Sequence, residues 1–169
     1  MSRKAYIIRF IVISVLGVLL HFTYDWSGNN PVVGLFSAVN ESTWEHLKLL
    51  FFPMLFLALI ELLFLRRRLP DNYLQARTLG ILSGMAFIII TFYTVWGILG
   101  MLIDSVNIAI YFLGVLVALL CENKLYKHTK ISAFASACIL AILTVAFFAF
   151  TRMTPDIGLF FDLAKHPVL

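Results

Sequence analysis

The chain has 169 residues, of which 62% are hydrophobic and 13% charged, and its mean hydropathy is +0.96. This composition excludes an ordinary soluble globular protein and predicts an integral membrane protein. The formal net charge of +4 does not indicate a nucleic-acid partner, because the basic residues border apolar runs, where anionic lipid accounts for them. The sequence contains no Gly-rich phosphate loop, nucleophile elbow or dinucleotide fingerprint. No linker or charge block divides residues 1–169, which predicts a single transmembrane helical domain.

Five apolar runs are long enough to cross a bilayer, which predicts an all-α, polytopic membrane protein with five transmembrane helices. The first run, residues 5–22, is longer than a signal-peptide core and should remain as a helix. Arg9 lies inside it, and we expect its side chain to reach back to the lipid headgroups. The second run begins at about Thr43 and contains Pro53, which is expected to kink it. The remaining predicted spans are residues 77–99, a helix with Asp104 as its N-cap that ends near Cys121, and residues 131–150.

The connection between the first two spans is unusual. Residues 27–31 contain Gly, Asn and Pro and predict a turn. Residues 32–39 are too apolar for an ordinary exposed loop, which indicates a segment that lies in the interface or dips into the membrane as a re-entrant half-helix. Either arrangement would shield the polar stretch that follows.

Small residues recur at helical spacing in the last two spans. Gly114 and Ala118 form one predicted packing face, and Ala133, Ala137 and Ala141 form another. Such faces suit close packing within the bundle, a homo-oligomer or a partner membrane subunit. The two cysteines, at positions 121 and 138, have no metal-type spacing and are not expected to form a disulfide.

The basic residues predict the orientation of the chain. Five spans place the termini on opposite faces, and ten of the thirteen Lys and Arg residues fall on the face of the N-terminus. Because Lys and Arg are retained in the cytoplasm, the N-terminus is predicted inside and the C-terminus outside, in the cytoplasmic (inner) membrane. The other face then holds six acidic residues against three basic ones, a net charge of about −3, together with three histidines.

One polar stretch stands out on that predicted outer face: residues 40–53, NESTWEHLKLLFFP. Ser42 and Glu45 fit a capping box that begins the second helix. The box leaves Glu41, His46 and Lys48 unexplained. The stretch therefore has two readings, plain helix capping and a functional site that also includes Asn40.

Histidine and carboxylate residues converge on this end from two helices. His21 and Asp25 share a face at the end of the first span, and the second span starts next to His46. We take His21, Asp25 and His46 as candidate ligands of zinc or another divalent cation. The sequence contains neither an HExxH nor a CxxC motif. Glu45 or Glu41 would be the general base, and Ser42 would position water or an oxyanion. The residues that could form further walls are Asp104 and His166.

One carboxylate, Glu61, falls within the apolar part of the second span. An intramembrane acid is a functional candidate by default. It lies close in sequence to the arginines at positions 66–68, so a simpler expectation is an ion pair with these or with headgroups.

The stretch NESTWEHLKLLFFP, with HFTYDWSGNNPVVGLFSAV before it, resembles an uncharacterised family of small bacterial multi-pass membrane proteins, a domain of unknown function. The resemblance covers nearly the whole chain through its NESxWEHLK core and implies five spans, with no established activity. A looser similarity links Ser42-x-x-x-His46 and His21-x-x-x-Asp25 to ceramidase and adiponectin-receptor-like membrane hydrolases. Those proteins have seven spans and a His-x-x-x-His pair that is absent from this chain.

Three functions remain open from the sequence. The first is a metal-dependent hydrolase or transferase acting on lipid or a small amphiphile. The second is a transporter or solute-binding subunit, in which Glu61 and Pro53 mark a path through the membrane. The third is a non-catalytic accessory subunit that docks on a partner through its small-residue faces.

Overall fold

The computed structural model describes residues 3–126 and 131–162. It contains five long helices, α1 (Arg3–Trp26), α2 (Thr43–Phe64), α3 (Tyr73–Leu99), α4 (Asp104–Leu125) and α5 (Ala133–Arg152). Two short 3-10 turns lie in the connections on either side of α2, η1 (Val33–Leu35) and η2 (Arg66–Arg68), and a third, η3 (Gly158–Phe160), follows α5. Each of the five is long and apolar enough to cross a membrane, and the described residues form no strand. The predicted all-helical architecture with five spans is therefore confirmed.

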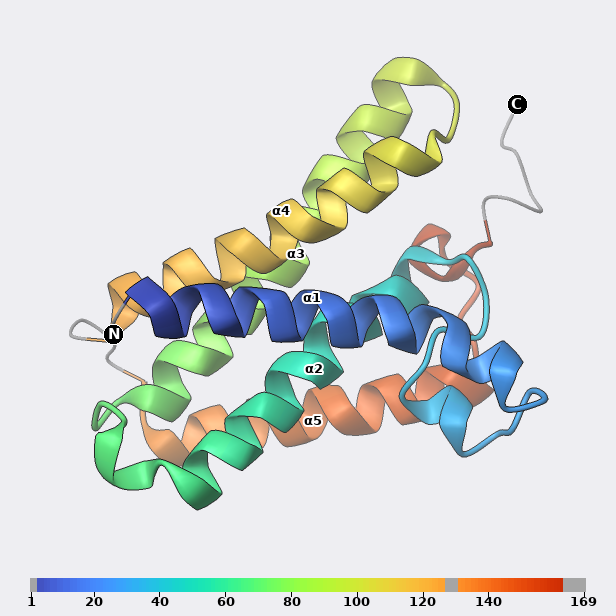
Figure 1. Ribbon diagram of the computed structural model, residues 1–169. Coiled ribbons are helices and arrows are strands. Elements are labelled where there is room, and N and C mark those ends of the chain that lie inside the picture. The colour runs from blue at the N-terminus through green and yellow to red at the C-terminus, as the bar shows by residue number, and fades with distance from the viewer. Residues whose placement is uncertain (1–2, 127–130, 163–169) are drawn as a thin grey trace.

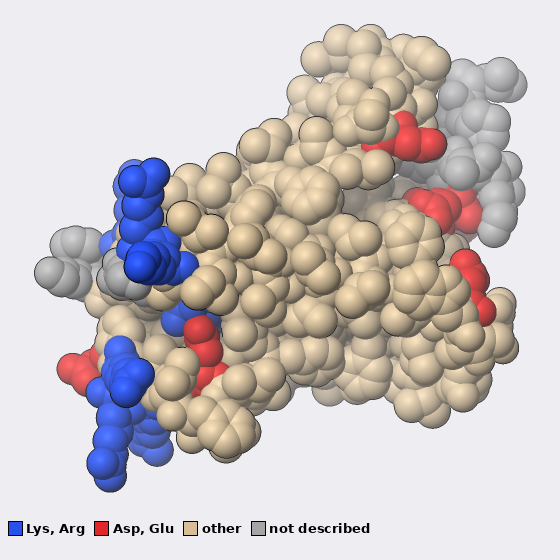
Figure 2. All heavy atoms as spheres, in the orientation of Figure 1, with Lys and Arg blue, Asp and Glu red and all other residues tan. Residues whose placement is uncertain are grey.

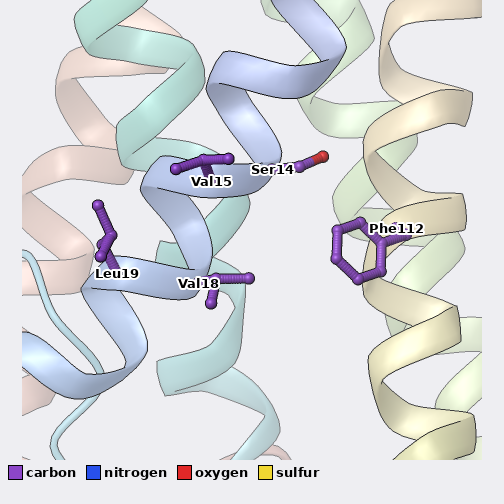
Figure 3. Close-up of a pocket in the computed structure, with 5 residues that line it drawn as sticks. All are labelled: Ser14, Val15, Val18, Leu19 and Phe112. Carbon is purple, nitrogen blue, oxygen red and sulfur yellow. The ribbon is translucent and has the colours of Figure 1, made fainter.

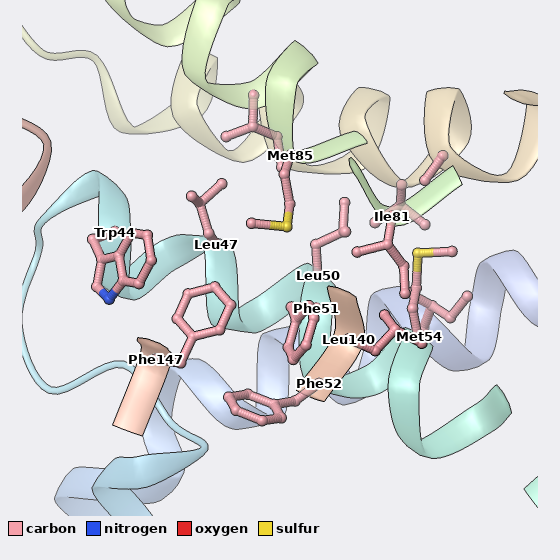
Figure 4. Close-up of a cluster of buried hydrophobic side chains, with 14 of the residues drawn as sticks. Trp44, Leu47, Leu50, Phe51, Phe52, Met54, Ile81, Met85, Leu140 and Phe147 are labelled. Carbon is pink, nitrogen blue, oxygen red and sulfur yellow. The ribbon is translucent and has the colours of Figure 1, made fainter. Parts of the chain in front are cut away.

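Helix α2 is the centre of the bundle, with α1, α3 and α5 packed around it (Figure 1). Of its most apolar window 56% is buried, against 17–28% in the other four helices. Its side chains Phe51, Phe52 and Met54 are fully buried and meet α3 and α5 in one apolar cluster (Figure 4). The helix runs through Pro53 without a break. The outer helices instead expose large apolar side chains, as expected of surfaces that face lipid.

Helices α3 and α4 form a hairpin that packs very closely over part of its length. A Cβ atom added to Gly84 would lie 2.8 Å from the Ala118 Cβ and 2.9 Å from the Gly114 carbonyl oxygen. The predicted small-residue face of α4 is therefore used inside the bundle, against α3. The other predicted face, formed by Ala133, Ala137 and Ala141, is exposed on α5.

The far part of this hairpin projects away from the rest of the bundle (Figure 1). Gly100 adopts a left-handed conformation, with φ of 66°, and its amide donates to the Trp96 carbonyl, which ends α3. Asp104 begins α4 as its first residue, while Ile103 is the N-cap and no side chain caps the helix. The prediction that Asp104 is an N-cap is therefore wrong, and its exposed side chain lies on the projecting part.

The two ends of the bundle differ in charge, as Figure 2 shows for one face. One end carries the start of α1, the arginine triplet of η2 and the end of α4, and we call it the basic end. The opposite end carries the acidic residues of the α1–α2 connection and of the segment after α5, and we call it the acidic end.

Candidate functional site

Residues 32–39 fold over the acidic end as a short irregular segment rather than a half-helix, with η1 as its only helical turn. The Ser37 hydroxyl anchors the segment, because it accepts from the Tyr24 amide at 3.1 Å and from the Thr23 hydroxyl at 3.0 Å. Ser37 and Ala38 are buried, whereas Val32 is exposed. The expected shielding of the polar stretch is therefore provided by a packed loop.

A buried ion pair lies beneath this loop. Lys48 Nζ is 2.6 Å from Glu45 Oε2 and donates to the Gly34 and Ser37 carbonyl oxygens at 2.8 and 3.2 Å. An ammonium group has three donors, so every donor of Lys48 has a partner. The ion pair thereby fastens the loop to α2.

The Glu45 carboxylate has further partners. It accepts from the Val39 amide at 3.1 Å and from the Thr151 hydroxyl of α5 at 3.2 Å. Its residue is 2% exposed. Glu45 is thus held as a structural anion, and its geometry does not favour the general-base role predicted from the sequence.

The predicted capping box forms only in part. Ser42 is the N-cap of α2, and its hydroxyl accepts from the Glu45 amide at 3.3 Å. The Ser42 amide donates to the Asn40 side-chain oxygen at 2.9 Å, so Asn40 takes the place expected for Glu45. The reason is that the Glu45 carboxylate points toward Lys48. Ser42 and Asn40 therefore shape the backbone at the start of α2, and Ser42 is too buried to contact a substrate directly.

A different set of residues meets at the surface of the acidic end. His21, Glu41 and His46 each offer one ligand atom, and these atoms lie within 4.8 Å of one another. The His21 and His46 rings are 5.1 Å apart, edge to face. His46 Nε2 is 3.3 Å from Glu41 Oε2, whose side chain is 54% exposed. We call these three residues the His/Glu cluster.

The hydrogen bonding of His46 fixes its orientation. His46 Nδ1 lies 2.9 Å from the Ser42 carbonyl oxygen, which can only accept a hydrogen bond. Nδ1 therefore carries a hydrogen, and Nε2 points to Glu41. A backbone carbonyl that holds one ring nitrogen in this way is the usual support of a metal-ligating histidine.

The structure brings together only some of the predicted site residues. His21 and His46 lie in the cluster, and Glu41 joins them as a potential ligand instead of a base. Asp25 lies one turn beyond His21 at the end of α1, is exposed, and is not among the clustered ligand atoms. Asp104 lies on the projecting hairpin. His166 lies outside the described residues.

A second polar centre lies near the basic end and involves the intramembrane acid Glu61. Glu61 is 6% exposed and is paired with two arginines, at 2.7 Å from Arg9 Nε and 2.9 Å from an Arg77 terminal nitrogen. Glu122 pairs with the same two arginines, each at 3.1 Å. Two carboxylates and two guanidinium groups thus form a neutral ring that joins α1, α2, α3 and α4, which we call the Arg/Glu ring.

Two tyrosines complete the Arg/Glu ring. The Tyr73 hydroxyl donates to Glu61 and accepts from Arg77 at 2.8 Å. The Tyr126 hydroxyl donates to Glu122 and accepts from Arg9 at 2.9 Å. Burial, together with the adjacent carboxylate of Glu122, raises the pKa of Tyr126, so its phenol stays protonated and acts as a donor.

The ring corrects two sequence-based expectations. Arg9 does not reach for headgroups, since it is 6% exposed and turned inward, and Glu61 pairs with Arg9 and Arg77 instead of the arginine triplet. Sequence reasoning missed Arg77 and Glu122 because it placed both at the borders of spans. A usable signal was present: Tyr73 and Arg77, and likewise Glu122 and Tyr126, are spaced i,i+4 and so share a helix face.

The chain belongs to a family of unknown function, DUF6512, whose model matches residues 1–166. The prediction of an uncharacterised family is thereby confirmed. No curated protein and no solved structure matches the chain. The looser similarity to ceramidase-like membrane hydrolases stays a prediction.

Proposed function

We propose that the His/Glu cluster binds a divalent metal ion, zinc being the best fit, and that the protein is a metal-dependent hydrolase or transferase acting at the membrane surface. Two imidazoles and one carboxylate are the protein ligands of several catalytic zinc sites, which leave a fourth position open. When bound, such an ion activates water for attack on a substrate. The cluster lies where α1 ends and α2 begins, and the Glu41 side chain is exposed, so a substrate can approach it.

One observation carries the proposal. The hydrogen on His46 Nδ1 is donated to a carbonyl, so in a neutral ring Nε2 presents a lone pair to the Glu41 carboxylate 3.3 Å away. Two acceptors at this distance repel unless a proton or a cation lies between them. His21 supplies a third ligand atom at the same point, which favours a metal over a lone proton.

Zinc binding to metal-free protein in nanodiscs, followed by calorimetry, tests the proposal. We expect one zinc per chain for the wild type and a loss of affinity of at least about tenfold, or about 1.4 kcal/mol, in His21→Ala, His46→Ala and Glu41→Gln. Asp25→Asn is the matched control, since Asp25 is an acid at the same end but outside the cluster. A wild type that binds no zinc, or an Asp25→Asn variant as weak as Glu41→Gln, would contradict the proposal.

The transporter alternative finds less support. Glu45 and Glu61 are about 24 Å apart along α2 at 1.5 Å per residue. Between them α2 buries Leu50, Phe51, Phe52 and Met54 in the apolar core, each at 0% exposure. These side chains leave dry packing between the two acids, where a transport path would need water or polar groups.

The orientation of the chain is part of the same proposal. The basic end is taken as cytoplasmic, which places the His/Glu cluster on the outer face of a bacterial inner membrane. Exposed single cysteines in a Cys121→Ser, Cys138→Ala background can test it. Asp156→Cys should react with an impermeant maleimide in intact cells, and Arg67→Cys should react only after lysis. The reverse pattern would invert the topology.

A further inference from the structure

Helices α1 and α4 meet at Tyr111, among other points. The Tyr111 hydroxyl lies 3.2 and 3.3 Å from the Ile13 and Ser14 carbonyl oxygens, and Gly17 leaves the space that this hydroxyl fills. Beyond this point, toward Asp104, the α3–α4 hairpin diverges from α1 (Figure 1). The two helices thus form a V whose vertex lies at Tyr111.

A cavity of about 190 Å³ lies near this vertex. Figure 3 shows its lining, which consists of Ser14, Val15, Val18 and Leu19 on α1 and Phe112 on α4. Apart from Ser14, every lining side chain is apolar. The cavity is therefore suited to a hydrocarbon chain.

Ser14 is the exception in this lining. Its residue is 5% exposed, and its hydroxyl is directed toward the Phe112 side of the cavity. Within the described part of the chain, the Ser14 hydroxyl has no hydrogen-bond partner. A buried hydroxyl without a partner lowers stability, so this atom indicates a ligand that brings an acceptor.

The cavity and the His/Glu cluster lie on one face of α1. Ser14, Val18 and His21 are spaced i, i+4 and i+7, which places them in one row along the helix. Seven residues correspond to about 10 Å of helix. The residues between Ser14 and His21 on α1 are all apolar, so about 10 Å of apolar helix surface separates the Ser14 hydroxyl from the His/Glu cluster.

We infer that the cleft between α1 and α4 binds an amphiphile. Its polar head lies at the His21–Glu41–His46 cluster, and its ester or amide carbonyl accepts from the Ser14 hydroxyl. Its alkyl chain lies against Val15, Val18 and Leu19. The inference rests on the proposed function and names its substrate class, a single-chain acyl lipid that enters sideways from the bilayer. It also assigns the reacting bond to the head group, because the carbonyl at Ser14 lies about 10 Å from the cluster.

Photo-crosslinking in nanodiscs tests where the chain binds. The probe is a lysophospholipid with a diazirine in its acyl chain, and mass spectrometry maps the labelled peptides. Labelling should concentrate on α1 around Val18 and on α4 around Phe112. Non-specific lipid would instead favour α5, since Ile142 and Val145 are 67% and 65% exposed, against 41% for Val18. Labelling spread in proportion to exposure would overturn the inference.

Two variants sharpen this test. Val18→Trp fills the cleft and should reduce labelling of α4 by about tenfold or more, whereas Ile142→Trp, a similar change on the exposed face of α5, should leave it unchanged. Equal labelling in both variants would overturn the inference. His46→Ala should lose zinc, whereas the label should still map to the peptides around Val18 and Phe112, because the acyl chain that carries the diazirine does not contact His46. A failed metal site and a failed lipid cleft therefore give different results.

The role of Ser14 is tested with an ether analogue of the same lysophospholipid, which lacks the carbonyl. Competition against the photoactivatable probe should show the ester binding about fivefold more tightly than the ether, as expected for one hydrogen bond. Ser14→Ala should remove this difference and keep binding of the ether unchanged. Equal competition by ester and ether in the wild type would overturn the assignment of the carbonyl to Ser14.

Discussion

The Arg/Glu ring and the His/Glu cluster, which lie near opposite ends of the bundle, differ in burial and in charge balance. In the Arg/Glu ring near the basic end, two acids are matched by two arginines, and all four residues are at most 6% exposed. In the His/Glu cluster at the acidic end, the side chains of His46 and Glu41 are 31% and 54% exposed. The ring is a neutral structure that joins four helices, whereas the cluster gathers ligand atoms where a solute can reach them. Burial with matched charge is consistent with a structural role for the ring, and the exposed, converging ligand atoms of the cluster are the basis of the proposed metal site.

The largest effect is expected from breaking the Arg/Glu ring. Arg77→Met leaves the ring with two carboxylates and one guanidinium, all buried, and should lower the free energy of unfolding by about 3–5 kcal/mol. Thermal unfolding in detergent measures it. The neutral double variant Arg77→Met, Glu122→Met should cost clearly less than the sum of the single variants. Additive losses would show that the two residues do not act as a unit.

The next largest loss of stability is expected from breaking the buried Glu45–Lys48 ion pair at the acidic end. Glu45→Gln leaves the Lys48 ammonium buried without a counter-charge and should cost about 1.5–3 kcal/mol in the same measurement. Thr151→Val removes only one neutral donor to Glu45 and should cost about 1 kcal/mol. A Glu45→Gln variant as stable as the wild type would mean that the loop over α2 is held by its apolar contacts alone.

A smaller loss of stability is expected from disturbing the close packing of the α3–α4 hairpin, which carries Arg77 and Glu122 of the Arg/Glu ring. Gly84→Ala places a Cβ within 3 Å of α4 and should cost about 1–3 kcal/mol. Gly97→Ala is the control on the same helix, because nothing lies within 4 Å of its added Cβ, and it should be neutral or stabilising by up to about 1 kcal/mol. If both variants behaved alike, the α3–α4 crossing would be looser than the structure shows.

Helix caps at the two ends allow a direct comparison. Ser42 caps α2 at the acidic end, and Ser132 caps α5 at the basic end, in each case by accepting from an amide three residues on. Both Ser→Ala variants should cost about 1 kcal/mol. Only Ser42→Ala is expected to alter zinc binding, because His46 is held by the Ser42 backbone. Equal zinc affinities in the two variants would show that the cap does not position His46.

The smallest effect on stability is expected at the cluster itself. In metal-free protein, Glu41→Gln should change the free energy of unfolding by no more than about 0.5 kcal/mol, as for other exposed positions. The same variant should lose zinc affinity. A stability loss like that of Arg77→Met would instead assign the cluster to structure and remove the contrast between the two ends.

The sequence predicted the membrane class, the five helices and the polar stretch before α2, because length and hydropathy dictate a membrane-spanning helix whatever its neighbours are. It also placed His21 and His46 at one end, since both lie at helix ends on the same side of the bundle. It did not predict the partners of Glu45, Arg9 and Arg77. The two arginines pair with acids on other helices, such as Glu61 for Arg9, 52 residues apart. Glu45 pairs with nearby Lys48 but also accepts from the Thr151 hydroxyl, 106 residues away.

By itself, the sequence thus determined which segments are helical and at which end each charged residue lies. Only the tertiary structure decided which charges are neutralised in the interior and which remain open to ligands. The physical reason is that helix formation in a bilayer depends on local composition, whereas the state of a charged side chain depends on the rotation and crossing of helices, which bring distant residues face to face or apart.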